Sequence, residues 1–97
     1  MNIIFEVTDK SGRKIRLTKK QWEHITTTHR DMTNYLEEIK GTIENPMKIT
    51  EHTAGNLKKY FRYIKNKKGP DNYLRLIIKY LNGDGFVLTA HFIRSIK

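Results

Sequence analysis

The stretch that decides the fold is residues 72–97, "NYLRLIIKYLNGDGFVLTAHFIRSIK". Both halves are rich in β-branched and aromatic residues, which favour strands. The Asn-Gly-Asp-Gly run between them is typical of a hairpin turn. The pattern therefore predicts two long antiparallel strands that pair with each other.

Alternate residues of these two strands divide into a core face and an open face, because side chains alternate across a strand. The predicted core face is mainly apolar and consists of Leu74, Leu76, Ile78, Tyr80, Phe86, Leu88, Ala90 and Phe92. The open face then carries Arg75, Lys79, Thr89 and His91. We expect these polar groups to lie together on one side of the sheet.

The N-terminal third predicts a hairpin followed by a helix. Residues 2–8 and 13–18 are β-prone and flank a turn, and the alternating charges of the second segment suggest an exposed edge strand. Thr18 and Gln21 match a capping box, so a helix should begin there and run to about residue 29.

The middle of the chain predicts a second helix over residues 34–45, which Pro46 stops, and then strands at 47–50 and 57–65. The resulting order is β-β-α-α-β-β-β-β. It indicates a single α+β domain, residues 1–97, in which two helices pack on one face of an antiparallel sheet as a two-layer sandwich.

The strand at 57–65 can face the core in either of two ways. We predict that Phe61 and Tyr63 point inward, which leaves Tyr60 and Arg62 on the open face. A bulge or a one-residue shift of register would reverse this arrangement.

Composition limits the classes of function. The chain has no cysteine, which excludes disulfides and thiolate metal ligands, and it lacks both a membrane-spanning apolar run and a signal-peptide pattern. We therefore expect a cytoplasmic protein. A net charge of +9 on 97 residues predicts attraction to a polyanion, either nucleic acid or an acidic protein. A solvated basic sheet face without a ligand is the alternative.

The two helix histidines, His24 and His29, are five residues apart. They would point about 140° apart around a helix, so both can serve one site only if the helix ends early. Their spacing also differs from the zinc pattern H-E-x-x-H. We predict no metal site and no cofactor.

Five segments in order resemble the phage-type branch of the Barnase–EndoU–colicin–RelE-like nuclease superfamily: "KIRLTKKQWEHITTTHRDM", "YLEEIKGTIENPMKI", "KYFRYIK", "NYLRLIIKY" and "GFVLTAHFIRSIK". The resemblance implies a metal-independent ribonuclease, often a toxin. His29 matches the family's helix-end histidine, although Arg30 replaces the usual proline. Thr89 and Ala90 match the last-strand pattern, in which His91 replaces an aromatic residue.

These observations leave three functions open. The first is an endoribonuclease acting on tRNA or mRNA through 2′-OH attack. Its expected catalytic residues are His29, His91, Thr89, Arg62 and Lys79, and its expected substrate-binding residues are Tyr60, Arg75, His24 and Lys59. The second is a non-catalytic RNA- or DNA-binding module. The third is an interaction domain that binds an acidic partner such as an antitoxin or immunity protein, which a ribonuclease toxin could also do. For any of the three we expect a monomer or weak dimer.

Overall fold

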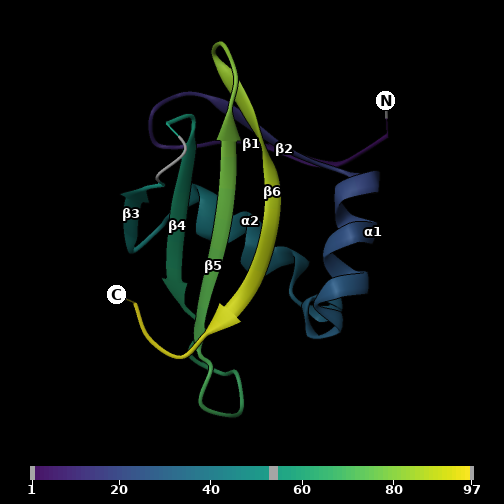
Figure 1. Ribbon diagram of the computed structural model, residues 1–97, viewed down its shortest axis with the longest axis vertical. Helices are drawn as coiled ribbons and strands as arrows, with labels where there is room; N and C mark the ends of the chain where they lie inside the picture. Colours follow the sequence, from purple (N-terminus) through teal and green to yellow (C-terminus); the bar gives the residue numbers. More distant parts are fainter. Residues whose placement is uncertain (1, 53–54, 97) are drawn as a thin grey trace.

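The computed structural model describes residues 2–52 and 55–96, and its elements follow the predicted order (Figure 1). The elements are β1 (Ile3–Thr8), β2 (Lys14–Thr18), α1 (Lys19–Thr28), the 3₁₀ helix η1 (Arg30–Asn34), α2 (Leu36–Glu44), β3 (Lys48–Glu51), β4 (Leu57–Tyr63), β5 (Tyr73–Tyr80) and β6 (Asp84–Ile93). The α+β class is confirmed. The short η1 turn was not foreseen.

The described strands form one sheet in the order β1-β2-β6-β5-β4-β3. Its pairs are antiparallel except that of β2 with β6, which run parallel where Lys14–Arg16 meets residues 84–86. The prediction that β2 is an edge strand was wrong. It lies between β1 and β6, and its alternation arises because Ile15 and Leu17 are fully buried.

Helix α1 begins where the capping pattern predicts. The Thr18 hydroxyl oxygen accepts a hydrogen bond from the backbone N–H of Gln21 at 3.2 Å. The helix ends at Thr28, and His29 is its C-cap with φ −126° and ψ 82°, outside helical geometry. His29 therefore does not continue the helical path of α1.

The helices and the sheet share one hydrophobic core. Ile25 of α1, Met32 of η1, and Ile39 and Ile43 of α2 are fully buried in it. In Figure 1, α2 crosses behind β4 and β5, whereas α1 stands beside the lower half of β6. Among the described residues, no helix covers the front of the sheet over β4 to β6 (Figure 1). Within the described ranges, no helix is both long and apolar enough to cross a membrane.

A β-bulge at Leu88 shifts the pattern of β6. Ile77 pairs with Thr89, but Ile78 pairs with Val87, so Leu88 is the extra residue. Val87 consequently enters the core, and Phe86 and Leu88 are only half-buried; their prediction as core residues was wrong.

Beyond the bulge the predicted alternation holds. Ala90 is fully buried, and Phe92 packs against the core. Strand β6 ends at Ile93, earlier than predicted, and residue 97 lies outside the described residues.

Strand β4 has the opposite orientation to the predicted one. Tyr60 is only 2% exposed and belongs to the core, opposite Leu76 of β5. Phe61 lies on the other face, opposite Arg75, where it is nevertheless buried at 2% exposure, and Tyr63 is 48% exposed. Tyr60 can point inward because its hydroxyl donates a hydrogen bond to buried Asp9 at 2.9 Å.

Candidate active site

Three cationic or imidazole side chains meet on the open face of the sheet. Arg75 of β5 and His91 of β6 are directly opposite each other, and Arg75 Nη2 lies 2.5 Å from His91 Nε2. The ring of His29 stacks on that of His91, with centroids 5.2 Å apart and planes at 26°. We call His29, Arg75 and His91 the histidine cluster.

The early end of α1 brings both of its histidines to the β6 side. His29, as the C-cap, turns onto His91, while His24 lines a hollow together with Thr89. Both histidines could serve one site only if the helix ended early, and α1 does end before His29. The sequence could not reveal that His29 contacts His91, because this contact joins residues 62 positions apart.

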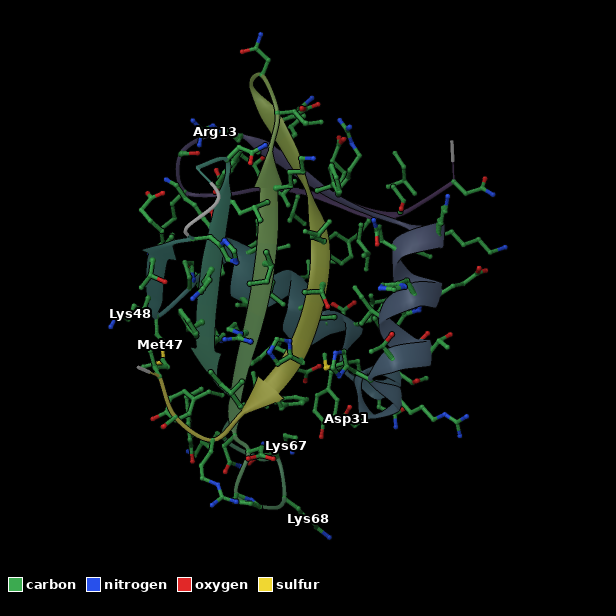
Figure 2. All side chains as sticks on the ribbon, viewed as in Figure 1. Arg13, Asp31, Met47, Lys48, Lys67 and Lys68 are labelled. Carbon is green, nitrogen blue, oxygen red and sulfur yellow. The ribbon has the colours of Figure 1, made fainter. Side chains whose placement is uncertain are left out.

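His91 is neutral at physiological pH. Burial, the charge of Arg75 and the charge of His29 lower its pKa from 6.5 to about 4, and Asp31 partly opposes them. Arginine can only donate hydrogen bonds, so His91 Nε2 must accept from Arg75 and the ring proton resides on Nδ1. Figure 2 shows Asp31 between the lower ends of α1 and β6.

The histidine cluster contains a hydrogen-bond donor without an acceptor in the described part of the chain. Arg75 Nε is buried and has no hydrogen-bond partner among the described residues. No hydrogen bond or ion pair observed in this part of the chain joins a carboxylate to Arg75, His29 or His91. A buried guanidinium N–H without an acceptor is costly, and a bound anion would satisfy it.

A hollow of about 380 Å³ adjoins the cluster between α1 and β6. It is lined by Lys20, Gln21, His24, Leu88 and Thr89. Thr89 precedes His91 by two residues on the same strand face, a separation of about 7 Å. The hollow therefore brings together the predicted residues His24 and Thr89, and Thr89 lies on the same strand face as His91 of the histidine cluster.

Two predicted lysines also lie on the open face. Lys79 pairs with Phe86, and Lys59 pairs with Ile77, in the sheet rows beyond the Arg75–His91 pair. They add positive charge to this face without contacting the cluster.

Two residues expected on this face lie elsewhere. Tyr60 is buried in the core, where no base can stack on it. Arg62 shares its side of β4 and donates a hydrogen bond from Nη1 to the carbonyl of Asn45 at 2.7 Å. Both placements on the open face were wrong, since β4 has the opposite register.

The sequence reading missed Lys20, Gln21 and Asp31 as neighbours of the site. Gln21 carried a signal only as a capping residue, and its side chain is free to line the hollow because the cap uses its backbone N–H. No group of three or more potential metal ligands is present among the residues that the structure describes.

A comparison with protein families now bears on this site. The model of the family described as "phage-Barnase-EndoU-ColicinE5/D-RelE like nuclease2" matches residues 5–96. The chain belongs to this nuclease family. The match includes the whole histidine cluster and confirms the resemblance found in the sequence. No match was found among curated proteins or among solved structures.

Proposed function

We propose that this nuclease is a metal-independent endoribonuclease that cleaves RNA by attack of a 2′-OH on the adjacent phosphate. The products are a 2′,3′-cyclic phosphate and a free 5′-OH. The observation that carries the proposal is the histidine cluster, in which two stacked imidazoles and a guanidinium with an unpaired N–H converge on one point of the open face.

The scissile phosphate binds Arg75. Its oxygens accept from the unpaired Nε and from Nη2, so Arg75 exchanges its hydrogen bond to His91 for charge-assisted bonds to phosphate. This exchange frees the lone pair on His91 Nε2. Lys79 and Lys59 raise the positive potential of the face, which attracts the polyanion before contact.

His91 then acts as the general base. It is already unprotonated, because its pKa lies near 4 in the free protein, and the negative phosphate favours the imidazolium that forms when it accepts a proton. Nε2 takes the proton of the 2′-OH as the O2′–P bond forms.

His29, whose ring stacks on that of His91, acts as the general acid. As the P–O5′ bond breaks, its imidazolium donates a proton to the leaving O5′, so that protons balance over the step. The Thr89 hydroxyl donates to a non-bridging phosphoryl oxygen, and Arg75 offsets the charge that grows on phosphorus-bound oxygens.

The decisive experiment is single-turnover cleavage of a labelled RNA in EDTA, with the product ends mapped. We expect 2′,3′-cyclic phosphate and 5′-OH ends, and no cleavage when a single 2′-deoxynucleotide replaces the nucleotide 5′ of the cut. Cleavage of that substrate, or 5′-phosphate products, would rule out 2′-OH attack. RNA binding without any cleavage would instead support a non-catalytic binding module.

For the cellular role, we propose a toxin-type ribonuclease that acts on cytoplasmic tRNA or mRNA and is neutralised by an acidic antitoxin or immunity protein. The support is the net charge of +9, which suits both polyanionic RNA and an acidic inhibitor. Induced expression in bacteria should arrest growth, and His91→Ala should not. Equal growth arrest by both proteins would contradict a toxic role for cleavage.

A further inference from the structure

A second hollow, of about 300 Å³, lies along the same side of the molecule. It is lined by Arg16, Thr18, Gln21, Leu81 and Phe86. Gln21 also lines the hollow that contains His24 and Thr89, so the two hollows are neighbours across the first turn of α1. Both hollows are lined in part by β6, through Leu88 and Thr89 in the first and Phe86 in the second.

The second hollow combines an apolar floor with a polar rim. The ring of Phe86 is half-buried and Leu81 is 48% exposed, although both are large apolar residues. The β-bulge explains this exposure for Phe86, because it sends Val87 into the core in its place. Gln21, whose carboxamide carries both donors and an acceptor, is one of the polar residues that line the hollow.

Arg16 completes the rim in a fixed position. Its Nη2 donates to Asp84 at 2.8 Å and its Nε lies 3.6 Å from Glu6, without a hydrogen-bond partner among the described residues. Aromatic stacking area beside a few directional polar groups is the chemistry that binds a nucleobase.

We propose that the Phe86 hollow is a nucleobase subsite of the RNA-binding surface. The nucleotide next to the scissile phosphate lies over His24 and Thr89, and the base of the following nucleotide stacks on Phe86 with its polar edge toward Gln21. The assignment of nucleotide positions rests on the proposed function; the binding of a base by the hollow does not.

A rival path for the strand crosses the opposite side of Arg75. Exposed Tyr63 and half-buried Tyr73 form an edge-to-face pair there, with ring centroids 5.4 Å apart. The Phe86 path is favoured because its hollow shares the lining residue Gln21 with the one beside the cluster. The hollow that Tyr63 lines shares no residue with the one beside the cluster.

The test measures binding of a fluorescein-labelled, fully 2′-O-methylated RNA octamer of mixed sequence, which cannot be cleaved by 2′-OH attack. Phe86→Leu retains apolar volume but removes the stacking ring. We expect it to weaken binding about 5- to 100-fold in fluorescence anisotropy. Tyr73→Leu, the matched control on the rival path, should change the dissociation constant less than about 2-fold.

Two further measurements keep the result interpretable. Gln21→Ala leaves the backbone N–H that caps α1 and should also weaken binding. Octamers that each lack one base are then compared. Loss of one particular base should weaken binding to the wild type. The same loss should weaken binding to Phe86→Leu little further, because both changes remove the same contact. Thermal unfolding confirms that each variant is folded.

The subsite is wrong if Phe86→Leu and Gln21→Ala bind like the wild type, or if Tyr73→Leu carries the loss instead. Octamer binding that depends on Phe86 in a protein that cleaves no RNA supports the subsite and rejects the proposed function. If the protein cleaves RNA but Phe86→Leu binds the octamer with unaltered affinity, the proposed function is supported and the subsite is rejected. A wild type that does not bind the octamer rejects the subsite.

Discussion

Two polar clusters lie on opposite faces of the sheet, and they differ in how their hydrogen bonds are satisfied. The Asp9–Tyr60–Tyr80 cluster lies on the core side, and the histidine cluster lies on the open side. On β5 the alternation that turns Tyr80 toward the core turns Arg75 away from it. One strand thus supplies a member to each cluster.

The buried cluster is saturated. Asp9 is 5% exposed; its Oδ1 accepts from the backbone N–H groups of Ser11 and Arg13 and from the Ser11 hydroxyl. Its Oδ2 accepts from Tyr60 and Tyr80 at 2.9 and 3.1 Å. Burial alone would raise the pKa of Asp9, but these hydrogen bonds outweigh it and lower the pKa below 3.8. The same burial raises the pKa of Tyr60 and of Tyr80 above 10.

The histidine cluster is the reverse case, because donors and positive charge exceed acceptors. Arg75 has an unpaired Nε, and its neighbour His91 is held neutral. The saturated network around Asp9 holds the turn between β1 and β2 against β4 and β5. The unsaturated histidine cluster has capacity for a ligand. We therefore expect substitutions in the buried cluster to change stability and substitutions in the histidine cluster to change cleavage.

The largest expected effect separates catalysis from stability at the histidine cluster. His91→Ala should lower the single-turnover cleavage rate about 10²- to 10⁴-fold, because it removes the proposed general base. The midpoint of urea unfolding should change little, since the side chain is only partly buried. His29→Ala should give a loss of similar size as the general acid. If only His29→Ala is impaired, the assignment of His91 as the base is wrong.

At the buried cluster we expect the reverse: a loss of stability with no loss of cleavage rate. Tyr60→Phe removes a hydrogen bond to a charged carboxylate and should lower the free energy of unfolding by about 1.5 to 3 kcal/mol. Cleavage per folded molecule should be unchanged. Tyr63→Phe on the exposed side is the matched control and should cost less than about 0.5 kcal/mol. Equal losses in urea unfolding would contradict a stabilising role for this network.

The two clusters should also lose stability in different pH windows. The folded pKa of His91, about 4, lies below its ordinary 6.5, so the unfolded chain binds the proton first and stability falls as pH drops from 6.5 toward 4. Asp9, with its pKa lowered below 3.8, contributes stability above that value and loses it as pH falls further. Urea unfolding across this range should show that His91→Gln removes only the upper window. An unchanged upper window in that variant would contradict the lowered pKa of His91.

The smallest effect concerns the hydroxyl next to His91. Thr89→Val is nearly isosteric and removes one neutral hydrogen bond to phosphate, worth about 0.5 to 1.5 kcal/mol, so the cleavage rate should fall about 2- to 12-fold. Thr27→Val, on the exposed side of α1, is the control for the same change of residue type. A Thr89→Val loss as large as that of His91→Ala would give Thr89 a larger role in the step than orientation of the phosphate.

The sequence by itself determined the order of the elements, the start of α1 and the grouping of Arg75, Lys79, Thr89 and His91 on one face. These features depend on residues close along the chain, through capping, turn residues and alternation within a strand. The face assignment on β6 was correct for Thr89 and His91 because they follow the bulge, and wrong for Phe86, which precedes it.

Tertiary structure alone decided the register of β4, the insertion of β2 beside β6, the bulge at Leu88 and the contact of His29 with His91. Each depends on partners far apart in sequence: Tyr60 turns inward because it meets Asp9, 51 residues away, and His29 reaches His91 only after α1 packs beside β6. Local patterns are the same for either face of such a strand, and burial of long-range partners selects between them. Alternation along the strands therefore predicts the polar face from the sequence, whereas long-range packing decides which of its residues come into contact.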